Sequence, residues 1–195
     1  MSTSDVGSKK MKISPTDYAA ETSRALEKPG CLLVSGDAKE ANVMTIGWGA
    51  IGVLWGKPVF MVAVRPSRHT YALLERTGEF TVNLPRKGME ATVAYCGAVS
   101  GRDVDKFEEK HLTKLPGEKV RTPIIAECCV HYECRVLWKT KVDDNIMPVP
   151  DDVKKRFYPK GDLHTVYFGE IVAARADDDA SESLAAVATY FPVKA

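Results

Sequence analysis

Basic and hydroxyl side chains gather in residues 65–71, Arg-Pro-Ser-Arg-His-Thr-Tyr, directly after an apolar run. The run, residues 59–64, has no polar member, which is typical of a strand buried on both faces. Pro66 ends this strand, and Ser67 is a favourable N-cap for a helix over about residues 68–77. A helix N-terminus presents free backbone N–H groups and partial positive charge, so the sequence predicts a place that suits an anion.

Four side chains around this turn have the chemistry to hold a phosphate monoester. Arg65 and Arg68 supply positive charge, and Ser67 and Thr70 supply hydroxyl groups. Phosphate carries a charge of about −1.5 to −2 at neutral pH, and charge-assisted hydrogen bonds to it are about twice as strong as neutral ones. An ordinary capped helix with solvated arginines explains the same residues, so the segment alone leaves both interpretations open.

The cysteines and histidines point to no metal site. Cys128, Cys129 and Cys134 lack the Cys-x-x-Cys spacing of zinc and redox centres. The odd total of five cysteines favours reduced thiols and a cytoplasmic protein. His111 and His131 have no chemical context, and we expect both at the surface.

Length and composition set broader limits. A chain of 195 residues is most simply one domain, here residues 13–195 after a polar stretch, 1–12, that we expect to be disordered. The net charge of +1, with both signs mixed along the chain, does not call for a nucleic-acid partner. No apolar run is long enough to span a membrane, and the polar start does not resemble a signal peptide.

Hydrophobic patterning predicts more strands than helices, and their spacing suits a closed barrel with helices at its rim. The predicted helices are residues 15–27, 68–77, 89–95 and 103–110. The predicted strands are residues 31–35, 42–48, 59–64, 79–84, 128–138, 165–174 and 186–191. A charged loop is expected over residues 141–163, and Gly47, Gly49 and Gly52 break regularity where another group approaches the backbone closely.

Six segments of this chain follow one another in a familiar order: residues 42–48, 65–71, 78–85, 95–101, 105–107 and 164–170. Together they resemble the flavin-reductase-like, FMN-binding split-barrel family, and within it the flavoredoxin branch, over roughly residues 13–191. The resemblance implies a mainly β (α+β) fold, a Greek-key-like split β-barrel with rim helices. It also implies a homodimer that binds FMN noncovalently at the subunit interface.

The resemblance assigns cofactor roles to residues along the chain. Residues 43–48 match the strand along the flavin's pyrimidine edge, where backbone groups could bond the ring, Gly47 would allow close approach and Thr45 would add a hydroxyl. Residues 65–70 match the phosphate-binding turn, and Lys106 is a further cation for the phosphate. The implied FMN contacts are Met44, Thr45, Ile46, Gly47, Trp48, Arg65, Ser67, Arg68, Thr70, Asn83, Cys96, Ser100, Gly101 and Lys106.

Some of these residues also have plain structural explanations. Residues 43–48 could be an ordinary barrel strand, and Lys106 a solvated helix lysine. Asn83 interrupts the strand opposite Phe80, Val82 and Leu84, and an asparagine buried there needs a hydrogen-bond partner, which the resemblance supplies as the cofactor. Cys96 has no identifiable base beside it, so an inert buried thiol is the alternative to a flavin contact.

His164 is the candidate catalytic residue. By resemblance it matches a histidine at the mouth of the flavin site, where it could orient nicotinamide or another partner, or carry a proton. One functional hypothesis is a flavin reductase, in which NAD(P)H reduces bound FMN, which then passes electrons to free flavin or another acceptor. The alternatives are a flavoredoxin-like carrier with a protein redox partner and a non-redox flavin-binding protein. Residues 141–163 depart from the family's short hairpin and could cover the flavin or a partner subunit.

Overall fold

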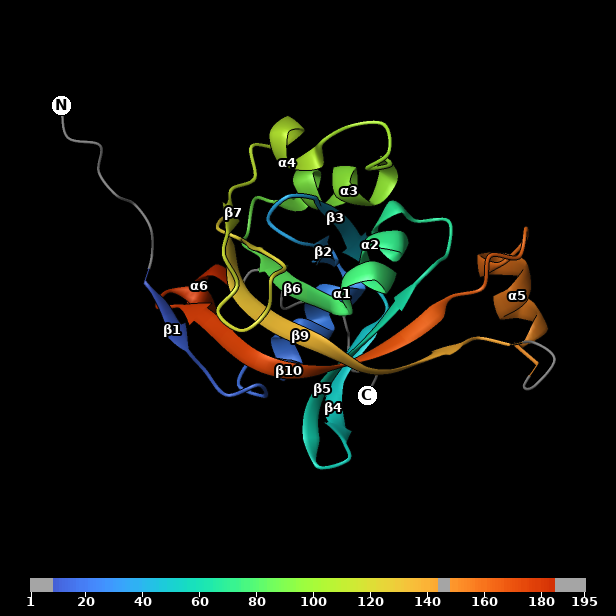
Figure 1. Ribbon diagram of the computed structural model, residues 1–195, viewed down its shortest axis with the longest axis horizontal. Helices are drawn as coiled ribbons and strands as arrows, with labels where there is room; N and C mark the ends of the chain where they lie inside the picture. Colours follow the sequence, from blue (N-terminus) through green and yellow to red (C-terminus); the bar gives the residue numbers. More distant parts are fainter. Residues whose placement is uncertain (1–8, 144–147, 185–195) are drawn as a thin grey trace, which may run out of the picture.

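We describe the protein from a computed structural model, which covers residues 9–143 and 148–184. Its centre is an eight-stranded antiparallel sheet whose main path runs in the order β3-β2-β6-β9-β10-β5-β4, with β1 paired to β10 (Figure 1). The strands are β1 (Lys10–Lys12), β2 (Cys31–Gly36), β3 (Ala41–Ile46), β4 (Gly49–Leu54), β5 (Lys57–Val64), β6 (Glu79–Pro85), β9 (Cys128–Lys141) and β10 (Thr165–Asp177). A small second sheet pairs β7 (Lys114–Leu115) with β8 (Ile124–Ile125).

The sheet curls because its two end strands are neighbours in the sequence. Only Gly47 and Trp48 separate β3 from β4, although these strands stand at opposite ends of the described strand order. The sheet must therefore bend round until its ends approach, and β3 indeed contacts β5. The resulting gap between β3 and β5, which we call the seam, is where the candidate site lies.

Helices cover the outside and the ends of this curled sheet (Figure 1). α2 and α3 pack on β2 and β3, α4 packs on β3, and α1 contacts β2, β4 and β6. The helices are α1 (Ala19–Glu27), α2 (His69–Thr77), α3 (Glu90–Ala98), α4 (Lys106–Glu109), α5 (Asp151–Phe157) and α6 (Ala180–Leu184).

Two apolar clusters follow from the alternation of side chains along β2. Leu33 belongs to the cluster inside the curled sheet, together with Phe60, Phe80 and Tyr132. Leu32 and Val34 face the other way, into a cluster with Val93 of α3 and Phe107 of α4. Each large side chain buried in this way contributes about 1.5–3 kcal/mol, so the helices are held firmly against β2 and β3.

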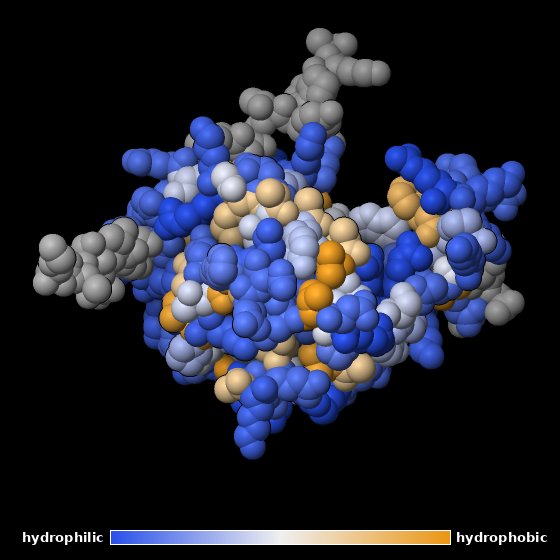
Figure 2. All heavy atoms as spheres, turned by 90° about the horizontal axis from the view of Figure 1, so that it is seen from above, coloured by the Kyte–Doolittle hydropathy of each residue, from blue (hydrophilic) through white to orange (hydrophobic). Residues whose placement is uncertain are grey.

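One part of the molecule stands away from the body (Figures 1 and 2). It consists of residues 138–143 and 148–163, which include the end of β9 and helix α5, and we call it the arm. The face seen in Figure 2 is mostly hydrophilic with small apolar groups. Within the described residues, no helix is both long and apolar enough to cross a membrane.

Several predicted boundaries need correction. Residues 10–12, expected to be disordered, pair with β10 as β1, and the glycine-rich residues 49–54 form strand β4 on the exposed edge, where glycine is tolerated. The loop expected over residues 141–163 contains helix α5. α1 begins at Ala19 instead of residue 15, and α4 is shorter than residues 103–110. The strand predicted at residues 186–191 lies outside the described residues.

Candidate functional site

Strand β3 presents alternate residues to two environments. Asn42, Met44 and Ile46 line pockets at the seam, whereas Val43 packs in the cluster beneath α3 and α4. The hydroxyl of Thr45 donates to the carbonyl of Val93 in α3, so its hydrogen is not available to a ligand. The alternation of a strand thus separates pocket-lining residues from residues that hold the helices.

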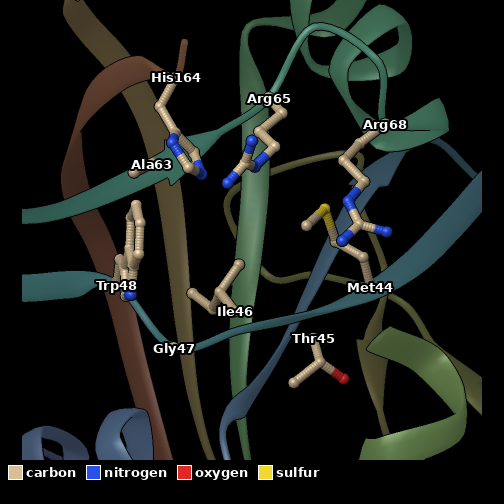
Figure 3. A pocket seen from close by; sticks show the side chains of 9 residues that line it. All are labelled: Met44, Thr45, Ile46, Gly47, Trp48, Ala63, Arg65, Arg68 and His164. Atoms are coloured by element: carbon tan, nitrogen blue, oxygen red, sulfur yellow. The ribbon is translucent and has the colours of Figure 1, made fainter. Parts of the chain in front are cut away.

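The first pocket has a volume of about 190 Å³ and lies where β3 ends. Arg65, Arg68 and His164 enter it from one side, opposite Met44, Ile46 and Trp48, while the side chain of Thr45 points away (Figure 3). Because of its two rings we call it the aromatic pocket; its lining is Met44, Thr45, Ile46, Gly47, Trp48, Ala63, Arg65, Arg68 and His164.

The second pocket, of about 100 Å³, continues from the first, since both are lined by Met44 and Arg68. It carries the cations Arg68 and Lys106, and within the described chain no carboxylate lines it. We call it the basic pocket; its lining is Asn42, Met44, Ser67, Arg68, His69, Thr70, Val99, Ser100, Gly101 and Lys106. Its charge suits an anion.

Lys106 is a buried cation and not the solvated helix lysine that was the plain alternative. Its side chain is 3% exposed, and Nζ donates to the carbonyls of Val43 at 2.9 Å and Cys96 at 2.8 Å. Burial lowers its pKa, and Arg68 lowers it further. An ammonium has three hydrogens, so two are used by protein carbonyls and one remains for another acceptor.

Asn42 and Gly101 shape the floor of the basic pocket. Asn42 Nδ2 donates to Thr70 Oγ1 at 2.6 Å, and both residues are buried. A Cβ on residue 101 would lie 1.9 Å from Asn42 Oδ1. Gly101 is therefore required to make room for Asn42, and Thr70, which also lines the pocket, accepts from this amide through its hydroxyl oxygen. Asn42 was not a predicted site residue. The available signal was its position two residues before Met44, because residues two apart on a strand lie on the same face.

The start of α2 differs from its predicted form. The helix N-cap is Arg68, not Ser67, and no side chain of the cap accepts a helix N–H group. Ser67 instead donates its hydroxyl and its backbone N–H, the latter at 3.2 Å, to the carboxylate of Asp162 in the arm. The anion at this turn is thus an internal carboxylate, which the sequence pattern did not reveal.

Arg65 also binds the arm. Its guanidinium donates to the carbonyl of Phe157 at 2.6 Å and to the carbonyl of Asp162 at 3.4 Å, and it lies 5.0 Å from the ring centre of Tyr158. Arg65 still lines the aromatic pocket, but its hydrogen bonds hold the arm. Of the two predicted arginines, Arg68 lines both pockets, and its guanidinium also donates to the carbonyl of Gly97 at 3.2 Å.

His164 lies at the back of the aromatic pocket and is 8% exposed. Its ring centre is 4.6 Å from that of Trp48, and Nδ1 is 2.7 Å from the hydroxyl of Tyr158. Burial, reinforced by Arg65 and Arg68 and opposed by Asp162, lowers the pKa of His164 to about 4, so its ring is neutral at pH 7. Phe157 packs edge-on against Trp48 at 5.1 Å, which brings the arm to the pocket wall.

Two predicted cofactor contacts belong to the core. Asn83 is fully buried, where its amide bonds Leu32 O, Thr81 Oγ1, Ile125 N and His131 Nδ1. Its partners are therefore protein groups, and it lines neither pocket. His131, expected at the surface, is fully buried beside it. Cys96 is 1% exposed in the cluster beneath α3, away from both pocket linings, and burial raises the pKa of its thiol.

The remaining predicted residues come together at the two pockets. Gly47 stands at the seam, with the carbonyl of Leu26 3.1 Å from where its Cβ would lie. Ser100 Oγ accepts from the backbone of Arg102 at 3.2 Å, so that its hydroxyl supports the loop. His69, within the predicted phosphate-binding turn, also lines the basic pocket. Ala63 and Val99 join the linings without having been predicted, since nothing in their residue type signals a site. Within the described part of the chain, no cluster of His, Cys, Asp and Glu could hold a metal ion.

Comparison with known proteins identifies the class of this fold. The chain belongs to the family described as "Flavin reductase like domain", whose model matches residues 23–192. It is 31% identical over 152 residues to an uncharacterized protein of Pyrococcus abyssi, covering 77% of this chain and 75% of that one. It is 34% identical over 116 residues to an uncharacterized protein of Archaeoglobus fulgidus, covering 60% of this chain and 64% of the relative's length.

Solved structures share the split-barrel architecture. The flavoredoxin of Methanosarcina acetivorans matches with a TM-score of 0.60 and 30% identity, over 77% of this chain and 69% of that chain. Nitrilotriacetate monooxygenase component B from Bacillus cereus matches with a TM-score of 0.64 over 89% of this chain and 88% of that chain; at 17% identity this likeness concerns the fold alone. The predicted mainly β split-barrel fold is therefore confirmed.

Proposed function

We propose that the protein binds FMN along the seam, with the phosphate in the basic pocket and the flavin ring in the aromatic pocket. The observation that carries this proposal is that the two pockets are joined at Met44 and Arg68 but differ in character. The basic pocket sets Arg68 and Lys106 among hydroxyl groups, whereas the aromatic pocket sets Arg65, Arg68 and His164 opposite apolar side chains on an edge strand. Edge strands have unpaired backbone N–H and C=O groups, which suit the polar rim of a planar ring.

The residues present fit this cofactor. Lys106 and Arg68 would hold the phosphate, while Met44, Ile46 and Trp48 would pack against the ring. Bound flavin supplies hydride and single-electron chemistry, and the protein's part is to hold the ring and exclude water. Taken together, the two pockets only come close to the lower limit of the about 300–1,000 Å³ usual for such sites, which is in keeping with a homodimer in which a second subunit completes the enclosure.

The reaction we propose is that of an NAD(P)H-dependent flavin reductase, which passes electrons from nicotinamide through FMN to free flavin or another acceptor. Membership of the flavin-reductase-like family supports this class. A protein of similar fold, 19% identical to this chain, is an NADH:FAD oxidoreductase of Streptomyces globisporus. The five cysteines are all reduced and buried, which supports a cytoplasmic location.

A second candidate is a flavoredoxin-like electron carrier with a protein redox partner. The 30% identity to the Methanosarcina flavoredoxin supports it, as does the arm, which brings Phe157 against Trp48 at the wall of the aromatic pocket. A wall built this way narrows the approach of a second planar ring such as nicotinamide.

The test is to titrate purified protein with FMN and then follow NADH and NADPH oxidation with and without added free flavin. Rapid turnover supports the reductase and contradicts a pure carrier. A bound flavin that dithionite reduces but NAD(P)H does not would contradict the reductase and support the carrier. A bound flavin that no reductant reduces would indicate a non-redox flavin protein, and failure to bind FMN would contradict all three.

A further inference from the structure

The aromatic pocket contains a histidine with one ring nitrogen engaged and the other available. His164 Nδ1 is 2.7 Å from Tyr158 Oη. Within the described chain, Nε2 has no hydrogen-bond partner. It is not a fully buried atom, because the ring borders the aromatic pocket. Whether Nε2 carries a hydrogen therefore decides what His164 offers to a ligand.

The protonation state of the pair follows from its surroundings. Burial and the charges of Arg65 and Arg68, partly offset by Asp162, lower the pKa of His164 to about 4, so the ring is neutral at pH 7. Burial raises the pKa of Tyr158, so its hydroxyl keeps its hydrogen. A neutral imidazole has one donor nitrogen and one acceptor nitrogen.

The direction of the hydrogen bond is set by Tyr158. Its hydroxyl has no second acceptor among the described residues, and the residue is 8% exposed. If Nδ1 carried the hydrogen, the tyrosine O–H would be left without an acceptor in a nearly buried place, which is unfavourable. The arrangement in which Tyr158 donates to Nδ1 satisfies both groups and leaves the hydrogen on Nε2.

The arm holds Tyr158 in place from both sides. Its backbone N–H donates to Lys154 O at 2.9 Å at the end of α5. The preceding residue, Phe157, is bound through its carbonyl to Arg65, and Asp162 is bound to Ser67. The hydroxyl therefore reaches Nδ1 from a fixed position.

We propose that Tyr158 is a positioning residue that keeps His164 in the Nε2–H tautomer, so that His164 donates a hydrogen bond to an acceptor oxygen or nitrogen of the ring bound in the aromatic pocket. This inference rests on the proposed function for the nature of the ligand. In this role His164 is a neutral hydrogen-bond donor at neutral pH and not a base. Of the two roles first considered for it, orienting a bound group or carrying a proton, this one is the first.

The experiment compares wild type with Tyr158→Phe, with Tyr95→Phe as a matched control on α3, away from both pockets. Long-range ¹⁵N–¹H correlation spectra of the flavin-free protein at pH 7 report the His164 tautomer, with signals assigned from His164→Gln. We expect Nε2–H alone in wild type and Tyr95→Phe, and a mixture of both tautomers in Tyr158→Phe. We expect FMN affinity to fall about 3- to 10-fold only in Tyr158→Phe.

A protonated Nδ1 in wild type, or a wild-type pattern in Tyr158→Phe, would overturn the proposal. So would an FMN affinity of Tyr158→Phe equal to that of wild type. Because the tautomer is measured without flavin, a wild-type protein that shows the Nε2–H form but binds no FMN would contradict the proposed function instead. Tyr158→Phe removes one hydroxyl, and unchanged circular dichroism would show that it folds.

Discussion

The carboxylate of Asp162 accepts hydrogen bonds from both the hydroxyl and the backbone N–H of Ser67, 95 positions away in the chain. It therefore stands where the residues around the start of α2 were expected to receive a phosphate. The cations that line the basic pocket are Arg68 and Lys106. Ser67 lines the same pocket while it binds the arm, so the arm and the pocket meet at this turn.

This arrangement predicts that Ser67→Ala affects the arm more than phosphate binding. Loss of the hydroxyl removes one contact to Asp162 at an exposed position, so we expect amide exchange to become faster over residues 157–163. The ratio of FMN to riboflavin affinity should change less than about twofold. Asp162→Ala should give the same exchange pattern. A large loss of FMN affinity with riboflavin unaffected would show that Ser67 binds the phosphate.

Arg68→Gln should weaken FMN but not riboflavin, because only FMN carries the phosphate. A charge-assisted hydrogen bond contributes about 1.5–3 kcal/mol, which corresponds to roughly 10- to 150-fold in affinity, measured by fluorescence titration. The control is Arg76→Gln at the other end of α2, where the side chain pairs with Glu40 at 2.6 Å. Equal losses for the two flavins would contradict a phosphate site in the basic pocket.

Lys106→Met should lower the free energy of unfolding even without flavin. The substitution leaves the carbonyls of Val43 and Cys96 without this donor. Each unpaired buried group costs about 1–3 kcal/mol, so denaturant unfolding should reveal a loss in the range of a few kcal/mol. Lys87→Met, at an exposed position, should change stability by less than about 0.5 kcal/mol. Equal stability of the two variants would mean that Lys106 is not a buried donor.

Gly101→Ala should damage the basic pocket through Asn42. The added Cβ would meet Asn42 Oδ1 at 1.9 Å and displace the amide that bonds Thr70. We expect FMN affinity to fall at least about tenfold, together with a stability loss of about 1–3 kcal/mol from overpacking. Gly52→Ala is the control, since nothing lies within 4 Å of its Cβ. Calorimetric titration and thermal unfolding of both variants would decide the matter.

The low pKa of His164 predicts that the folded protein loses stability in mild acid. Its pKa is about 4 in the folded protein, below the ordinary value of 6.5, chiefly because of burial. The unfolded chain therefore takes up a proton first as the pH falls, so stability decreases between about pH 6.5 and pH 4. Burial lowers the pKa of His131 too, which adds to the slope. His164→Gln should flatten this part of the stability curve, measured as the free energy of unfolding at a series of pH values.

Local patterning was sufficient for much of the fold. The apolar run 59–64 is strand β5, and the alternation of residues 79–84 is strand β6. These predictions succeed because burial on one or both faces imposes a period on neighbouring residues. Strand β4 was missed because glycines hide that period on an exposed edge, and β1 because three residues are too short to show one.

Local patterning was less informative about the candidate site. Asn83 lies within strand β6 and Arg68 at the start of α2. The pattern could not tell that Asn83 contacts His131 in the core while Arg68 lines the pockets. For Lys106 the sequence left open a phosphate contact and a solvated lysine, because the carbonyls that bury it come from the distant residues 43 and 96. Side-chain partners of this kind depend on how distant segments pack.

By itself the sequence determined the strand-rich architecture, a strand at residues 42–48 and the concentration of basic residues near α2, since these follow from periodicity and residue type. Only the tertiary structure decided that β3 ends the described sheet and faces β5 across the seam. It also decided that Asp162 accepts hydrogen bonds from Ser67 and that the hydroxyl of Tyr158 bonds with the ring of His164. A hydrogen bond acts over about 3 Å, and no local pattern records which distant group arrives within that distance.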